Sequence, residues 1–342
     1  MDTARATWEL ENNIQDLPAD DATKLFRYDD AEQKAIQQQK PWVRNPHYFK
    51  HVRVSALALI KMTMHCRSGK NLEVMGMLQG KTVGDTFVVL DAFALPVEGT
   101  ETRVNAQAEA YEYMVDFVQA SKDVGRKEHV VGWYHSHPGY GCWMSGIDCS
   151  TQMLNQQYTE PFLAIVIDPV RTCAAGKVEI GAFRTYPQGY KPPEEPQSKY
   201  QTIPMNKIED FGVHANSYYS LDVSFFKSLS DARTLDVLWN KYWVNTLSSS
   251  PLRTNSQFIS QQLADLAEKM NKSSESQAAQ AGRMGGLLIS GASGSSREKE
   301  SEESNLRRVA LDSAKCIVEQ AKGMATHILK DAIFNRTARS TQ

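Results

Sequence analysis

The sequence lacks a charge excess of either sign. Its 38 basic and 40 acidic side chains leave a formal net charge of -2. Nucleic-acid-binding proteins carry a basic excess that complements the phosphate backbone, so we predict no nucleic-acid partner. Long hydrophobic runs are missing too, because the longest clearly apolar run, Phe162 to Ile167, is far shorter than the roughly 20 residues of a membrane helix. We therefore also predict no membrane association.

Paired cysteines are absent as well. The five cysteines are an odd number, and none belongs to a C-x-x-C pair, which argues against a disulfide framework and against a four-cysteine zinc site. The first residues, MDTARATWELENN, have neither the basic start nor the apolar stretch of a secretory signal peptide. A hydrophobic fraction of 41% with 23% charged residues is ordinary for a globular protein. Together these features predict an intracellular soluble protein.

The central part of the chain mixes two apolar periods. Helical spacing predicts helices over 52–66, 106–124 and 147–158. Alternating or continuous apolar residues predict strands over 72–78, 87–95, 129–135, 162–167 and 177–185, the first two separated by Gly80 and Gly84. Such a mixture indicates an α/β domain in which helices cover a central sheet.

The remaining segments are less regular. Prolines after Tyr186 exclude regular structure, and 206–247 has a largely helical pattern. An apolar stripe along the last helix either folds back onto its own domain or enters a bundle with other chains. The predicted divisions are an N-terminal arm (1–47), a core (48–190), a proline-rich segment with a helical extension (191–250), a helix (251–280), a flexible linker (281–304) and a C-terminal helix for complex assembly (305–342).

One stretch contains candidate metal-ligating residues. It is HSHPGYGCWMSGID, residues 135–148. His135 and His137 stand two positions apart at a strand end, so both imidazoles project from the same face. A loop containing glycines then leads to Asp148, which adds a carboxylate. Three nitrogen and oxygen ligands with one open position are typical of a catalytic zinc site, whereas structural zinc sites are closed by four. The H-x-H pair alone is weak evidence, and the shaped loop with Ser145 ahead of Asp148 strengthens it.

This pattern resembles the JAMM motif of the MPN-domain (MPN+) metalloproteases, and Glu73 in NLEVMGMLQG occupies the place of that family's upstream glutamate. The resemblance extends through VEGTETRVNAQAEAYEYM, GAFRTYPQGYKPP and LWNKYWVNTLSSS. It is closest to the branch of catalytic, deneddylating subunits of the COP-nine signalosome. It implies an MPN (JAB/JAMM) domain, which is a cytidine-deaminase-like α/β fold with a central mixed sheet flanked by helices, followed by C-terminal helices.

The resemblance also implies a zinc-dependent isopeptidase. One catalytic Zn²⁺ per chain would be held by His135, His137 and Asp148. Glu73 would be the general base for the attacking water, and Ser145 would donate to the oxyanion, a contribution of roughly 3–4 kcal/mol. The implied substrates are cullin-type ubiquitin ligases that carry a ubiquitin-like modifier. The implied partners are other signalosome subunits, including an MPN-domain partner, in the cytoplasm and nucleus.

Regulation is a separate hypothesis. In the family that this sequence resembles, the segment between the second strand and the following helix can cover the metal and shut off the free subunit. Here that segment is 97–106, in which Glu101 is the carboxylate best placed to compete for the open zinc position, with Arg103 beside it. We therefore predict that the free chain is autoinhibited and opens on assembly with its partners. The alternative is that VEGTETRVN is a mobile surface loop.

Several alternatives stay open on the sequence alone. A ubiquitin-chain deubiquitinase of the proteasome-lid type shares the GWYHSHPG segment, and a non-catalytic MPN scaffold would only hold partners together. Glu73 could be a strand-end charge that faces water, and Ser145 could be only the N-cap of the following helix. Cys142 and Cys149 could complete a closed His2Cys2 zinc site, or Cys142 could be the nucleophile of a cysteine protease.

Overall fold

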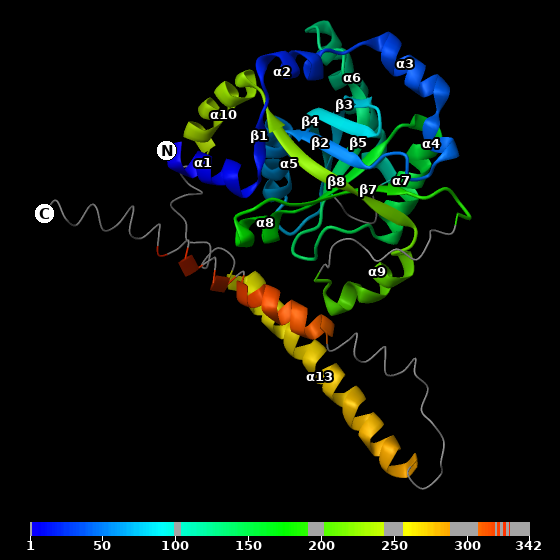
Figure 1. Ribbon diagram of the computed structural model, residues 1–342, viewed down its shortest axis with the longest axis vertical. Coiled ribbons are helices and arrows are strands. Elements are labelled where there is room, and N and C mark those ends of the chain that lie inside the picture. The colour runs from blue at the N-terminus through cyan, green and yellow to red at the C-terminus, as the bar shows by residue number, and fades with distance from the viewer. Residues whose placement is uncertain are drawn as a thin grey trace, which may run out of the picture. The chain divides into compact units, whose positions relative to one another are not determined.

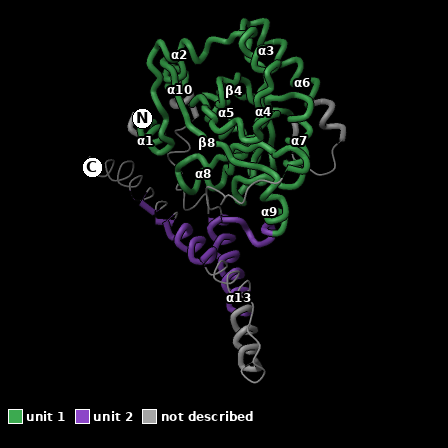
Figure 2. The backbone as a smooth tube through the Cα atoms, turned by 45° about the vertical axis from the view of Figure 1, so that its right-hand side comes forward, with its two compact units in different colours: residues 1–201, 209–246 green, residues 202–208, 247–342 purple. Residues whose placement is uncertain are grey.

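The computed structural model describes residues 2–98, 104–190, 202–242, 256–287 and 307–318, and positions 320, 321, 324, 325 and 328. The chain divides into two compact units, one of residues 1–201 with 209–246 and the other of residues 202–208 with 247–342 (Figure 2). Within the described ranges, no helix is both long and apolar enough to cross a membrane.

A mixed eight-stranded sheet forms the centre of the first unit (Figure 1). Its strands are β1 (Ile14–Asp16), β2 (His51–Ser55), β3 (Val74–Val83), β4 (Thr86–Glu98), β5 (His129–Ser136), β6 (Leu163–Asp168), β7 (Glu179–Thr185) and β8 (Tyr218–Lys227). Their spatial order is β1-β8-β2-β4-β3-β5-β6-β7, and β7 also pairs with β8, so the sheet closes on itself.

Helices flank this sheet, which confirms the predicted α/β class. In chain order the helices of the first unit are α1 (Asp2–Glu11), α2 (Ala19–Phe26), α3 (Asp30–Gln39), α4 (Pro41–Arg44), α5 (Ala56–Ser68), α6 (Val104–Asp123), α7 (Gly146–Thr159), α8 (Pro169–Ala175), α9 (Ile208–His214) and α10 (Leu229–Tyr242), and the second unit contains α13 (Ser256–Leu287). A short 3-10 helix, Met205–Lys207, precedes α9.

The alternation of side chains along β5 separates the two faces of the sheet. Tyr134 belongs to the core cluster that includes Leu59 and Met62 of α5, whereas Trp133 packs in a second cluster with Cys149 of α7. Since residues two apart share a face of a strand, His135 lies on the same side of the sheet as Trp133 and α7. The fold thus directs the histidine motif toward the N-terminal end of α7.

The helix predicted over 52–66 is wrong at its start. Residues His51–Ser55 form β2, which runs parallel between β4 and β8, and the helix begins only at Ala56. Val52 and Val54 are both fully buried, which is the period of a strand. Ser55 caps the helix, because its hydroxyl accepts a hydrogen bond from the Ala58 N–H at 3.0 Å.

Two further predictions about strands are wrong. The largely helical pattern over 206–247 contains β8, whose aromatic residues Phe225 and Phe226 are buried in register with β1 and β2. Gly80 does not end a strand but lies inside β3, where a Cβ atom would come within 2.0 Å of the Val88 carbonyl oxygen. The turn between β3 and β4 falls at Gly84, the second of the two predicted glycines, which has a φ of 56°.

The predicted N-terminal arm takes part in the sheet, and α13 extends into the predicted linker. The N-terminal arm packs onto the sheet through the parallel pairing of β1 with β8, and the Asn12 side chain accepts a hydrogen bond from the Val178 N–H at 2.9 Å. In the second unit, α13 runs to Leu287, past the predicted start of the linker, since glycine costs a helix only about 1 kcal/mol relative to alanine. The linker's remainder, 288–304, lies outside the described residues.

A buried ion pair connects segments within the second unit. Lys269 of α13 donates to the carboxylate of Asp312 and to the backbone carbonyl of Ile203, both at 2.8 Å. Asp312 lies in residues 307–318, which are helical, as predicted for the start of the C-terminal helix. One ammonium group therefore holds three segments of this unit together.

Candidate metal centre

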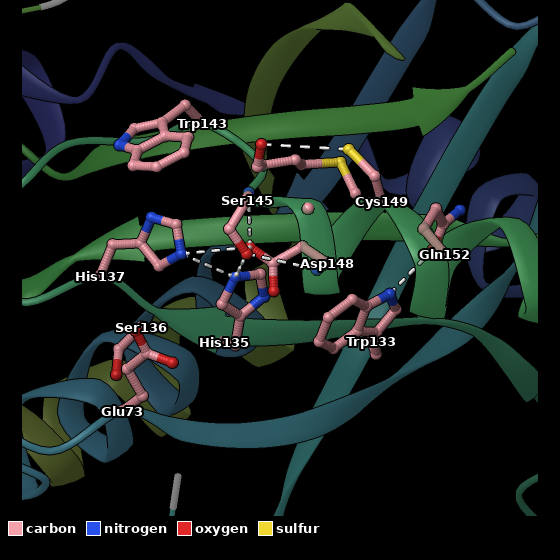
Figure 3. A network of polar contacts seen from close by, with 12 residues as sticks. Glu73, Trp133, His135, Ser136, His137, Trp143, Ser145, Asp148, Cys149 and Gln152 are labelled. Carbon is pink, nitrogen blue, oxygen red and sulfur yellow. Dashed lines mark hydrogen bonds and ion pairs between the residues drawn. The ribbon is translucent and has the colours of Figure 1, made fainter. Parts of the chain in front are cut away.

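The two histidines of the motif lie at the carboxyl end of β5. His135 is within the strand, and His137 extends it by donating its N–H to the Ile167 carbonyl of β6 at 2.9 Å. Both side chains are buried, and their rings lie with centroids 4.8 Å apart. Figure 3 shows the two imidazoles directed toward the same point. The same-face prediction from the H-x-H spacing is therefore correct.

Asp148 reaches this point from the first turn of α7. Ser145 is the N-cap, and the two residues form a reciprocal capping box. The backbone N–H and the hydroxyl of Ser145 donate to Asp148 Oδ2 at 2.9 and 2.8 Å, and the Asp148 N–H donates back to Ser145 Oγ at 3.3 Å. The cap predicted for Ser145 is present, and it aims the carboxylate at the histidines.

The three candidate ligand atoms converge at metal-binding spacing. The Nε2 atoms of His135 and His137 are 3.0 Å apart, and they lie 3.3 and 3.4 Å from Asp148 Oδ2. A tetrahedral zinc ion with bonds of about 2.0–2.1 Å would separate its ligand atoms by about 3.3 Å. The donor set therefore fits a zinc ion with one position left open. Among the described residues it is the one cluster of three or more His, Cys, Asp or Glu with this closeness.

Charge explains how the three groups coexist. Burial raises the pKa of Asp148, but the adjacent His135 and His137 lower it far more, so the carboxylate stays ionised. Burial lowers the pKa of His135, yet the Asp148 carboxylate outweighs this, and the net direction is upward, with a smaller contribution from Glu73. The metal-free site thus attracts a proton to the position where a cation would bind.

Asp168 supports the loop that follows the histidines, and the sequence patterns did not identify it. It is fully buried at the end of β6, and its carboxylate accepts the N–H groups of Gly139 and Gly141 at 3.0 and 2.9 Å. The Gly141 carbonyl in turn bonds His137 Nδ1 at 3.1 Å. Since a carbonyl only accepts, Nδ1 carries the proton and Nε2 is left free to bind a metal. The signal in the sequence that could have identified Asp168 is an acidic residue at the end of the most apolar strand.

Glu73 lies directly before β3 and is exposed, unlike the three candidate ligands. The hydroxyl of Tyr140 donates a hydrogen bond to its carboxylate, and the Tyr140 ring stacks on His137 with centroids 4.5 Å apart. Ser136 joins the same regions from the other face of β5, because its hydroxyl accepts the Val74 N–H at 2.9 Å. Glu73 is therefore tied to the histidine pair, although it faces solvent.

The cysteines take no part in this cluster. The thiol of Cys142 donates to the Glu179 carbonyl at 3.3 Å, and that of Cys149 approaches the Met144 carbonyl at 3.9 Å. Burial raises the pKa of both thiols, that of Cys149 to about 12. Because the thiolate is the form that binds metals and attacks carbonyls, the geometry disfavours both the His2Cys2 site and the cysteine protease. Glu101 and Arg103 lie outside the described residues.

Comparison with known families agrees with this geometry. Residues 47–161 match the family model described as JAB1/Mov34/MPN/PAD-1 ubiquitin protease. Residues 248–335 match the model described as the Cop9 signalosome subunit 5 C-terminal domain. The fold and the buried His-His-Asp cluster therefore define a JAB/MPN-domain protein of the hydrolase type, with a second domain characteristic of one signalosome subunit.

Similarity to individual relatives covers nearly the whole chain. The sequence is 61% identical to COP9 signalosome complex subunit 5b of Arabidopsis thaliana, over 98% of this chain and 93% of that protein. It is 57% identical to subunit 5 of Drosophila melanogaster, over 98% of each chain, and 56% identical to subunit 5 of Dictyostelium discoideum, over 99% and 98%. The chain belongs to the COP9 signalosome subunit 5 family.

Removing a candidate ligand should abolish metal binding. We expect His135→Ala and Asp148→Asn to lose stoichiometric zinc, because two ligands do not hold the ion in a site built for three. His129→Ala is the control, since this exposed histidine lies at the opposite end of β5. Elemental analysis of zinc-loaded, gel-filtered protein measures the difference. Zinc retained at full stoichiometry by both ligand variants would contradict the assignment.

Acidification should also release the metal. Zinc binds the neutral imidazole. Because the pKa of His135 is raised, protons begin to compete with zinc for this ring at a higher pH than they would for an ordinary histidine. As the pH falls below that pKa, the apparent zinc affinity should drop about tenfold per pH unit for each proton displaced. Chelator competition between about pH 8 and about pH 6 measures this slope. An affinity that is flat over this range would contradict the expectation.

Proposed function

We propose that this chain is a zinc-dependent isopeptidase that removes a ubiquitin-like modifier from lysines of cullin subunits of ubiquitin ligases. It would act as the catalytic subunit of a COP9 signalosome, with the other subunits, including an MPN-domain protein, as partners in the cytoplasm and nucleus. The observation that carries the proposal is the buried cluster of His135, His137 and Asp148, with ligand atoms at tetrahedral spacing. The names of the relatives support the assembly.

The chemistry divides between the ion and the side chains. When bound, zinc lowers the pKa of a water molecule to about 7 and polarises the scissile carbonyl. The Glu73 carboxylate then accepts the proton of the attacking water and passes it to the leaving lysine amine. The hydroxyl of Tyr140 holds one Glu73 oxygen, which leaves the second oxygen to carry the proton.

Ser145 would have two tasks. Its hydroxyl donates to Asp148 Oδ2 at 2.8 Å, and its backbone N–H makes a second bond to the same oxygen. For the oxyanion role we propose that the hydroxyl turns toward the developing negative charge while the N–H keeps the carboxylate in place. The cap and the oxyanion donor are then successive uses of one residue.

The substrate alternative is a ubiquitin chain, as for a deubiquitinase of the proteasome-lid type. The match of residues 248–335 to the subunit 5 C-terminal domain favours the signalosome reading, and the complete His-His-Asp cluster favours an enzyme over an inert MPN scaffold. Modified cullins and ubiquitin chains offered side by side to the assembled complex distinguish these functions. Preferential cleavage of ubiquitin chains would support the alternative.

Glu73→Gln should separate metal binding from turnover. We expect the variant to keep its zinc and to lose roughly 10²–10⁴-fold in cleavage rate, since an amide cannot accept the proton. Glu11→Gln, which neutralises an exposed glutamate at the end of α1, is the matched control. The measurement is single-turnover release of the modifier from a conjugated cullin, together with zinc analysis. Unchanged turnover in Glu73→Gln would refute the general-base role.

Autoinhibition remains a proposal about residues 97–106. Glu101→Ala should increase cleavage of a small isopeptide substrate by the free chain, because the variant lacks the carboxylate that we propose competes for the open coordination position. The double variant Glu101→Ala, Glu73→Gln is the control and should stay inactive. An absence of any gain in the free chain would remove the support for a closed state that depends on Glu101.

A further inference from the structure

The two candidate histidine ligands are oriented by different means. His137 bonds the Gly141 carbonyl through Nδ1, whereas Nδ1 of His135 is buried and has no hydrogen-bond partner within the described part of the chain. Metal-binding histidines almost always donate their second ring nitrogen to a carboxylate, a carbonyl or a water. A further restraint on the His135 ring comes from a contact of another kind.

That contact is the indole of Trp133. Its ring stacks on the His135 imidazole with centroids 4.6 Å apart and planes inclined by 15°. The two residues share a face of β5 because they are two positions apart. Stacking on a broad, fixed surface restricts rotation of the imidazole about its long axis, so Nε2 stays directed at Asp148 and His137. This restriction requires that the position of the indole itself is fixed.

Gln152 holds the indole. Its Oε1 accepts the Trp133 Nε1–H at 2.8 Å, and its Nε2 donates to the Phe162 carbonyl at 3.0 Å and to Gln156 Oε1 at 2.8 Å. The side chain is fully buried, so both ends of the amide are anchored. Gln152 follows Asp148 by four residues on α7 and therefore lies on the same side of that helix. Figure 3 shows the Gln152 amide bonded to the Trp133 indole, beside the candidate ligands His135 and Asp148.

We propose that Gln152 is a positioning residue for the metal site. It fixes the Trp133 indole, and the indole sets the plane of the His135 imidazole. One face of α7 thus supplies a ligand, Asp148, and the orientation of a second ligand. This inference rests on the metal site of the proposed function and extends it to residues outside the ligand set.

The test compares the buried Gln152 with the half-buried Gln156 of the same network. Gln152→Met removes the acceptor of the indole N–H at similar volume. Gln156→Met is the control, because without Gln156 the Gln152 amide still accepts from the indole and still donates to the Phe162 carbonyl. Zinc affinity of the full chain is measured by chelator competition, and ligand geometry by the visible absorption of the Co²⁺-loaded protein. We expect Gln152→Met to lose about 10–100-fold in affinity with an altered spectrum, and Gln156→Met to stay near the wild type.

A second variant keeps the test decisive if Gln152→Met does not fold. Trp133→Phe retains a ring for stacking but removes the N–H, so it should show the same loss. Combining both substitutions should add nothing further, since each breaks one shared contact. Wild-type affinity in either single variant, equal losses in Gln156→Met, or additive losses in the double variant would overturn the inference. Absence of zinc binding by the wild type would instead overturn the proposed function.

Discussion

The structure depends on one crowded arrangement, in which a carboxylate and two imidazoles share a buried position with their ligand atoms 3.0 to 3.4 Å apart. In a low-dielectric interior, such a group is costly unless a cation or a proton lies among the three. The neighbouring strand and helix fix the three side chains in this arrangement. The end of β5 delivers both histidines, and the first turn of α7 delivers Asp148 with its charge directed by the capping box.

The surrounding polar groups keep the cluster in one geometry. Asp168 fixes the loop after His137 through two glycine N–H groups, and Ser136 ties β5 to the start of β3. Two of these hydrogen bonds, those of Gly141 and Val74, are buried, and losing one partner of a buried bond leaves the other unsatisfied at a cost of about 1–3 kcal/mol. The histidine pair is thus one end of a connected hydrogen-bonded frame rather than two independent side chains on a flexible loop.

Holding a metal and moving a proton make opposite demands on burial. The candidate ligands are buried, which strengthens electrostatic contacts and excludes competing water. Glu73, the proposed base, is exposed and bonds the hydroxyl of Tyr140, as suits a group that is proposed to exchange protons. The same division explains why Tyr140 lies at the boundary, with its ring on His137 and its hydroxyl on Glu73.

The sequence by itself determined the features set by short spacing. The H-x-H pair placed two imidazoles on one face of a strand, Ser145 and Asp148 marked the start of α7, and alternating periods gave the α/β class. Tertiary structure alone decided what depends on register between distant segments. It placed 218–227 in the sheet as β8 and set Asp168 under the histidine loop, and it brought the Gln152 amide to the Trp133 indole. Periodicity reports which face of an element is apolar, but a buried polar contact forms between side chains whose meeting is fixed only when the strands and helices pack.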